Sequence, residues 1–291
     1  MSVPMNLAGK TAIVTGVADD VGFAWHIALA LQAAGADIYL LSHPRVCSIV
    51  ERFLTRGQSA ESRKLPFGVA GEFKPKALIG CDVGCDTDAD IDPAMKGEKG
   101  YDKDVSIAGA FAEVAKLTSS VDILIHSVAF SPEIGKPLPE VSRKAYLTAQ
   151  SISAYSLTAM CRAAAPLMKG RGGSVVGLSY MASERAVPFY GGGMSGAKAA
   201  LESDSRLLSW FLGEEGHRVN IVSAGPYASR AAKSIGDIGQ MIDQTAQRSP
   251  LRRAIDAEDV ANAVLFLSSD LSRNVTGTTV YVDAGYHAMG T

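Results

Sequence analysis

The sequence has no surplus of basic residues, since 28 lysines and arginines stand against 30 aspartates and glutamates, for a formal net charge of -2. Nucleic-acid-binding proteins normally carry a basic excess, so this balance argues against a nucleic-acid partner. Long apolar runs are also missing: no stretch reaches the roughly 18 apolar residues of a membrane span. The N-terminus, MSVPMNLAGK, lacks an apolar signal core. These absences predict a protein with neither nucleic-acid nor membrane partners.

Cysteine is scarce, and the sequence has only Cys47, Cys81, Cys85 and Cys161. No CxxC or CxxH spacing occurs, so we expect no zinc or other metal site. Scattered cysteines of this kind are typical of reduced thiols in a reducing compartment. We therefore expect a cytoplasmic location, or the stroma of a plastid-type organelle if a transit peptide has been removed.

Short apolar runs alternate with helical stretches along the whole chain. This alternation is typical of parallel βαβ units, and strands this apolar are buried beneath helices on both faces. We therefore predict an α/β fold, with one Rossmann-type domain over residues 1–291 and a doubly wound, mostly parallel sheet of about seven strands. Residues 81–104, rich in Asp, Gly and Lys, are predicted to form a polar surface loop. The predicted strands cover residues 11–16, 37–41, 77–80, 121–127, 173–179, 218–225 and 278–285.

The first strand is followed by GVADDVGFAW (16–25), in which Gly16 and Gly22 stand where a dinucleotide fingerprint has its glycines. Gly16 permits a tight turn, and Gly22 opens a helix whose free N–H groups and dipole can hold a pyrophosphate. The alternative is a glycine turn that serves only packing. We predict a nucleotide site here.

The second strand ends in LLSHPRV, without the acidic residue that usually binds the ribose hydroxyls of NAD. Arg45 lies close enough to attract a 2′-phosphate, which keeps NADPH open as the less favoured cofactor beside NADH. Asp82, just after the third strand, is predicted either to accept a hydrogen bond from the adenine amino group or to cap its own loop.

The segment YGGGMSGAK (190–198) lacks a tyrosine four residues before its lysine. Short-chain carbonyl reductases place their catalytic tyrosine there, but this chain has Met194, which cannot donate a proton. Three consecutive glycines make a continuous helix unfavourable, because each costs about 1 kcal/mol relative to alanine. We predict that a helix begins near Met194 and that the glycines fold Tyr190 back toward Lys198. Tyr180 ends the preceding strand, so two phenols and one ammonium can converge.

The segment SYMASERAVPFYGGGMSGAKAALESD (179–204) resembles the short-chain-type enoyl-[acyl-carrier-protein] reductases of bacterial and plastid fatty-acid synthesis. That family has a tyrosine, a second tyrosine ten residues later, and a lysine seven or eight residues beyond. The triple glycine resembles the plant, chlamydial and apicomplexan branch. Further similarity lies in GVADDVGFAW, VDILIHSVAFSPEIGKPL (121–138), SAGPYASRAAKSIG (223–236) and YVDAGYHAMG (281–290).

The resemblance implies NADH-dependent reduction of a trans-2-enoyl thioester carried on acyl carrier protein. Tyr190 would stabilise the enolate oxygen, Lys198 would hold the nicotinamide ribose, and Tyr180 would line the thioester site. The implied cofactor-binding residues are Gly16, Asp20, Gly22, Phe23, Ala24, His43, Asp82, Val83, Ser127, Val128, Ala129, Lys198, Gly225, Pro226, Tyr227 and Ser229. The implied substrate residues are Tyr180, Tyr190, Ala129, Phe130, Tyr227, Ala231 and Ile235.

Two residues depart from the branch pattern. His43 replaces a usual tryptophan near the adenine, which puts adenine affinity in question, and Tyr227 replaces a usual leucine or isoleucine beside the nicotinamide. A mobile substrate lid is implied near residues 226–245. Two alternatives remain: a short-chain carbonyl reductase or alcohol dehydrogenase, and a catalytically silent nucleotide-binding protein. The apolar helices expected over residues 145–168 and 194–213, together with the resemblance, predict a homotetramer.

Overall fold

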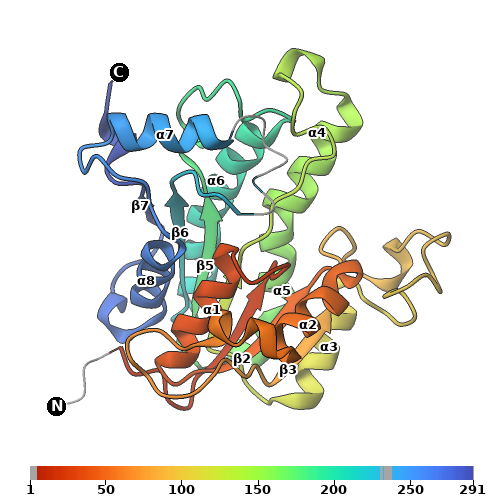
Figure 1. The fold of residues 1–291 in the computed structure, drawn as a ribbon. Coiled ribbons are helices and arrows are strands. Elements are labelled where there is room, and N and C mark those ends of the chain that lie inside the picture. The colour runs from red at the N-terminus through yellow and green to blue at the C-terminus, as the bar shows by residue number, and fades with distance from the viewer. Residues whose placement is uncertain (1–4, 230–231, 233–237, 291) are drawn as a thin grey trace.

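The computed structural model describes residues 5–229, 232 and 238–290. Its core is one seven-stranded sheet in the order β3-β2-β1-β4-β5-β6-β7, and every neighbouring pair of strands is parallel (Figure 1). The predicted single-domain α/β fold is therefore confirmed. The strands are β1 Thr11–Thr15, β2 Asp37–Ser42, β3 Ala77–Gly80, β4 Ile123–His126, β5 Ser174–Ser179, β6 Arg218–Ala224 and β7 Thr279–Val282.

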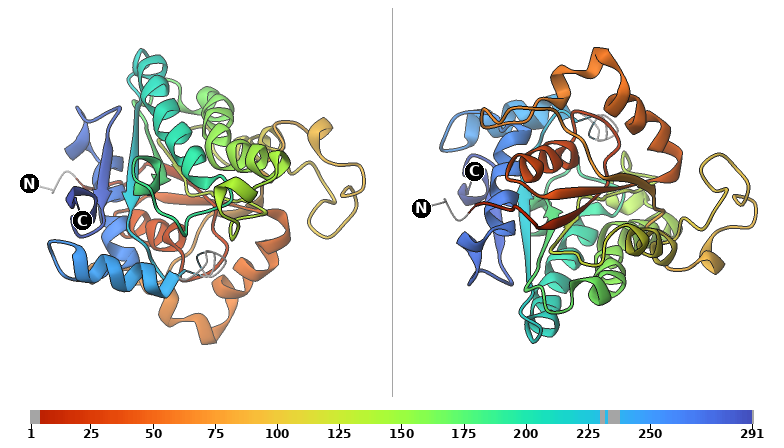
Figure 2. Two further views of the ribbon diagram at one scale, coloured as in Figure 1. Left: turned by 90° about the horizontal axis from the view of Figure 1, so that it is seen from above. Right: turned by 90° about the horizontal axis from the view of Figure 1, so that it is seen from below.

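Helices cover both faces of the sheet, as Figure 2 shows. One apolar cluster joins the sheet to α1, α2 and α8, and a second joins its other face to α3, α5 and α6. The inner strands β1, β4, β5 and β6 therefore have no solvated face, which explains their apolar sequences, whereas the edge strands β3 and β7 are mostly half-buried. The helices are α1 Phe23–Ala33, α2 Cys47–Thr55, α3 Ile107–Leu117, α4 Arg143–Gln150, α5 Ser156–Met168, α6 Met194–Gly213, α7 Ile238–Arg248 and α8 Ala257–Ser268.

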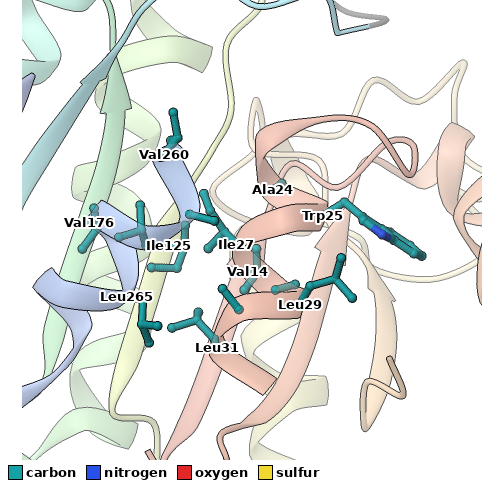
Figure 3. Packing of buried hydrophobic residues seen from close by; sticks show 14 of the residues in the cluster. Val14, Ala24, Trp25, Ile27, Leu29, Leu31, Ile125, Val176, Val260 and Leu265 are labelled. Atoms are coloured by element: carbon teal, nitrogen blue, oxygen red, sulfur yellow. The ribbon is translucent and has the colours of Figure 1, made fainter. Parts of the chain in front are cut away.

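The first cluster surrounds α1, as the close view in Figure 3 shows. Ile27 on α1, Val14 on β1, Ile125 on β4 and Val260 on α8 are all fully buried there. Burying such side chains contributes roughly 1.5–3 kcal/mol each. The packing holds the start of α1 at the carboxyl edge of the sheet, where ligands bind in open α/β folds.

One long helix predicted over residues 145–168 is divided in the structure. It consists of α4, a π-helical turn at Ser151–Tyr155, and α5. The π turn lets the Ser156 hydroxyl donate to the carbonyl of Ile152 at 2.7 Å. Such a turn leaves no mark in apolar periodicity, so the sequence did not predict it.

The loop predicted over residues 81–104 lies between β3 and α3 and projects from the side of the molecule (Figure 1). It is not wholly polar, since Cys85, Ile91 and Tyr101 are buried with Val105 in a small apolar cluster of their own. The loop therefore has a fixed core. Among the described helices, none is both long enough and apolar enough to cross a membrane.

Candidate active site

Three glycines at positions 191–193 form the turn that leads into α6. Gly193 is the N-cap of this helix and has a φ of 78°. A Cβ on Gly191 would lie only 2.1 Å from the carbonyl oxygen of Lys136, so no larger residue fits against that segment. Met194, the first residue of α6, is 2% exposed and packs in the protein core. The predicted helix start is confirmed, and the position that carries the tyrosine in carbonyl reductases holds a core residue.

The glycine turn brings the two tyrosines together. The ring centroids of Tyr180 and Tyr190 lie 5.0 Å apart with an edge-on interplanar angle of 69°. Tyr180 directly follows β5 and is 9% exposed. Burial raises the pKa of both phenols; Tyr286 and Asp283 raise that of Tyr180 further, and Tyr180 raises that of Tyr190. Both side chains therefore stay protonated at neutral pH and can donate a hydrogen bond.

Lys198 lies beneath the end of the same strand. Its side chain is 4% exposed, and its Nζ donates to the carbonyl oxygen of Leu178 at 2.7 Å. Desolvation lowers the pKa of this lysine to about 8, against the opposing charge of Glu202 one helical turn further along α6. Glu202 is itself buried and accepts a hydrogen bond from Ser179. The end of β5 therefore carries two phenols and a buried ammonium.

The predicted nucleotide site lies where the strand order reverses, between β1 and β4. Gly16 has a φ of 78°, and a Cβ there would lie 2.0 Å from the carbonyl oxygen of Ser127. Thr15 fastens the two strand ends, because its hydroxyl donates to Ile125 O at 2.9 Å and accepts from Ser127 N–H at 3.2 Å. This switch point is the usual dinucleotide site of a doubly wound sheet.

The residues after β1 fit a pyrophosphate. Gly22 is the N-cap of α1, and no side chain there caps the first N–H groups of the helix. Asp19 accepts from the N–H groups of Val21 and Gly22 and shapes the turn. The ring of Phe23, the first helical residue, lies 5.1 Å from that of Tyr227, which follows β6. Two segments far apart in sequence thus lie side by side at this edge of the sheet.

The other predicted residues differ in burial. Ala24 belongs to the core beneath α1, which leaves only its backbone for a cofactor. Gly225 and Pro226 are buried at the end of β6. Ala231, Ile235 and part of the predicted lid at 226–245 lie outside the described residues. Half-buried or exposed positions are Asp20, Phe23, Val83, Ser127, Val128, Ala129, Phe130, Tyr227 and Ser229.

At the ends of β2 and β3, His43 and Asp82 face one another across Tyr101. The phenol of Tyr101 lies 2.6 Å from Asp82 Oδ2 and 3.3 Å from His43 Nε2. The guanidinium of Arg45 lies 3.1 Å from the sulfur of Met95 in the loop. The predicted cofactor residues His43 and Asp82 are thus linked by Tyr101, which belongs to the loop that was predicted to be a polar surface loop.

Sequence reasoning missed two residues of the site. Tyr101 is the single aromatic residue in the polar stretch 81–104, and that isolation was the available signal. Glu202 lies four residues after Lys198 and therefore on the same face of α6, a spacing that can be read from the sequence.

Comparison with known proteins agrees with this geometry. The family described as "Enoyl-(Acyl carrier protein) reductase" matches residues 101–287. The chain is 44% identical over 291 residues to the chloroplastic enoyl-[acyl-carrier-protein] reductase [NADH] of Arabidopsis thaliana, covering 99% of this chain and 74% of that protein.

Solved structures agree as well. The enoyl-acyl-carrier-protein reductase of Plasmodium berghei with triclosan matches with a TM-score of 0.91 and 36% identity, covering 97% of this chain and 99% of that one. The Anaplasma phagocytophilum reductase in complex with NAD matches with a TM-score of 0.80 and 35% identity, covering 100% and 98%. The chain therefore belongs to the enoyl-[acyl-carrier-protein] reductase family.

Proposed function

We propose that this protein uses NADH to reduce the trans-2 double bond of enoyl thioesters on acyl carrier protein, in fatty-acid synthesis. The observation that carries the proposal is the edge-on pair of Tyr180 and Tyr190, with buried Lys198 at the end of the same strand and Met194 in the core. Family membership supports the same chemistry. For its location we propose the cytoplasm or a plastid-type stroma, the latter supported by the chloroplastic relative.

When bound, the cofactor supplies a hydride to the β-carbon of the enoyl thioester. Negative charge then develops on the thioester oxygen, and Tyr190 donates a hydrogen bond to it. The raised pKa of this phenol keeps its proton in place. Lys198 holds the nicotinamide ribose hydroxyls and keeps the local potential positive, while Tyr180 lines the thioester site. Protonation of the α-carbon completes the saturated thioester.

Carbonyl reduction is the competing chemistry within this fold. We expect the protein to oxidise NADH with crotonyl thioester and to leave acetoacetyl thioester unreduced, as measured by loss of NADH absorbance. Butyryl thioester identified by mass spectrometry would support the proposal. Turnover of acetoacetyl thioester alone would contradict it, and NADH binding without any turnover would indicate a catalytically silent protein.

We predict that NADH is preferred to NADPH at neutral pH. Arg45 is exposed and directed to Met95, and one such arginine adds only about 1 kcal/mol toward a phosphate, or under tenfold in affinity. Burial lowers the pKa of His43 below its ordinary 6.5, so this imidazole is neutral near pH 7. The preference should therefore narrow only as pH falls below the ordinary pKa of an imidazole and His43 gains charge. Steady-state kcat/KM with each cofactor measures this, and a ratio favouring NADPH at neutral pH would contradict it.

We also predict a homotetramer. On α6 the side chains of Leu207, Trp210 and Phe211 are 59%, 71% and 61% exposed, and Leu147 on α4 is 58% exposed. An apolar face of this extent on neighbouring helices is typical of a helix-to-helix interface with two-fold symmetry.

Light scattering at micromolar concentration should report the tetramer. We expect Trp210→Glu to shift the protein to a smaller species. Leu117→Glu places the same charge on an equally apolar position of α3, where Leu117 is 55% exposed, and should leave the mass unchanged. A stable wild-type monomer would overturn this prediction.

A further inference from the structure

The loop at 81–104 folds back onto the strand ends that were predicted to bind the adenosine half of the cofactor. Gly100 packs against Pro44 so closely that a Cβ would lie 2.7 Å from the Pro44 carbonyl oxygen. Met95 contacts the Arg45 guanidinium, and the ring of Tyr101 lies edge-on to His43 at a centroid distance of 6.3 Å. Three points of the loop therefore rest on residues 43–45.

The hydrogen bonds at this contact form one chain of donors and acceptors, from the Arg45 N–H through His43 and Tyr101 to Asp82. His43 Nδ1 accepts from the N–H of Arg45 at 3.3 Å, which assigns the ring proton to Nε2. That Nε2–H donates to the Tyr101 oxygen, so the single hydroxyl proton of Tyr101 is left for Asp82 Oδ2 at 2.6 Å. The N–H of Gly84 donates to Asp82 Oδ1 at 3.0 Å. Both carboxylate oxygens are thus held by donors.

Burial is unequal along this chain of bonds. Tyr101 is 6% exposed, whereas the side chains of Asp82 and His43 are 20% and 47% exposed. The phenol is therefore anchored inside the loop cluster, while the Asp82 carboxylate remains partly open to solvent. Burial lowers the pKa of His43 and raises that of Tyr101, which agrees with a neutral imidazole and a protonated phenol.

We infer that Tyr101 is a positioning residue that fixes the Asp82 carboxylate as the acceptor for the exocyclic amino group of the cofactor adenine. The inference rests on the proposed function only in taking NADH as the cofactor. A carboxylate held in this orientation accepts from the amino group of adenine but repels the carbonyl oxygen that hypoxanthine has at the same place. The loop thereby makes the site selective for adenine over hypoxanthine.

The test compares equilibrium Kd values, from cofactor fluorescence, for NADH and for nicotinamide hypoxanthine dinucleotide (reduced). We expect the wild type to bind NADH about 10- to 100-fold more tightly, the range for a hydrogen bond to a charged group. Tyr101→Phe should reduce this ratio to a few-fold, mainly by weakening NADH. Tyr155→Phe is the matched control, because Tyr155 donates to Asp86 of the same loop at 2.7 Å and should keep the wild-type ratio.

The variant Asp82→Asn tests whether Tyr101 acts by positioning Asp82 or only by stabilising the fold. If Tyr101 acts through Asp82, the single variant Asp82→Asn should lower the ratio by itself, and adding Tyr101→Phe should lower it no further. Equal ratios in wild type and Tyr101→Phe, or a wild type that does not distinguish the two dinucleotides, would overturn the inference. If Tyr101→Phe failed to fold by circular dichroism, an unchanged ratio in Asp82→Asn would overturn the inference.

A wild type that binds NADH but reduces no enoyl thioester would refute the proposed function, and the Kd comparison would still decide this inference.

Discussion

Replacing Tyr190 with phenylalanine is expected to lower kcat on a carrier-protein enoyl substrate by about 100- to 1000-fold, the usual effect of removing one oxyanion donor. The phenylalanine ring keeps the edge-on contact with Tyr180 at 5.0 Å, so the fold and the NADH Kd should not change. Steady-state kinetics and fluorescence titration of NADH measure the two quantities separately.

Tyr180→Phe is the matched control, because it removes the same hydroxyl from the other ring of the pair. A smaller loss is expected, since Tyr180 is proposed to line the site. If Tyr190→Phe kept near wild-type rates while Tyr180→Phe lost turnover, the enolate hydrogen bond would belong to Tyr180.

Replacing Lys198 with alanine is expected to impair cofactor binding as well as turnover. The buried ammonium is proposed to hold the nicotinamide ribose, and a hydrogen bond from a charged group contributes roughly 1.5–3 kcal/mol, so the NADH Kd should rise about 10- to 100-fold. Lys198→Met, which keeps most of the side-chain volume, should show the same rise. Unchanged NADH affinity in both variants would remove the lysine from the cofactor site.

The pH profile provides a second check on Lys198. Because desolvation lowers the pKa of this lysine to about 8, the wild-type ammonium is charged below that pH and loses its proton above it. We therefore expect kcat/KM to fall as pH rises through about 8, and the residual activity of Lys198→Met to lack that alkaline limb. A wild-type profile that is flat from pH 7 to pH 9.5 would contradict the assignment.

Most of the fold could be predicted because the strands are short apolar runs that alternate with helical stretches. The start of α6 could also be predicted, since glycines 191–193 exclude a helix upstream of Met194. Contacts between segments that are far apart in the sequence could not be predicted. Nothing local to Phe23 indicates that Tyr227 packs beside it at 5.1 Å, more than two hundred residues later.

The adenosine end was the least predictable part. The sequence shows Arg45 as a basic group free to meet a phosphate, but the structure directs its guanidinium to Met95 at 3.1 Å. Asp82 could be interpreted as an adenine acceptor or as a loop cap. In the structure it accepts a hydrogen bond from Gly84 N–H in its own loop, and its side chain stays 20% exposed. The surroundings of both residues depend on how the loop at 81–104 folds back onto the strand ends. The composition of the loop does not indicate that folding.

The most direct test of the account is the fate of the transferred hydrogen. Crotonyl thioester is reduced in H2O with NADH that carries deuterium at the transferred C4 position, and the product is analysed by NMR and mass spectrometry. The account predicts butyryl thioester with one deuterium at C3 and a solvent hydrogen at C2. Crotonyl thioester recovered without label, together with deuterium on the hydroxyl-bearing carbon when acetoacetyl thioester is supplied, would show that the protein reduces carbonyl groups instead.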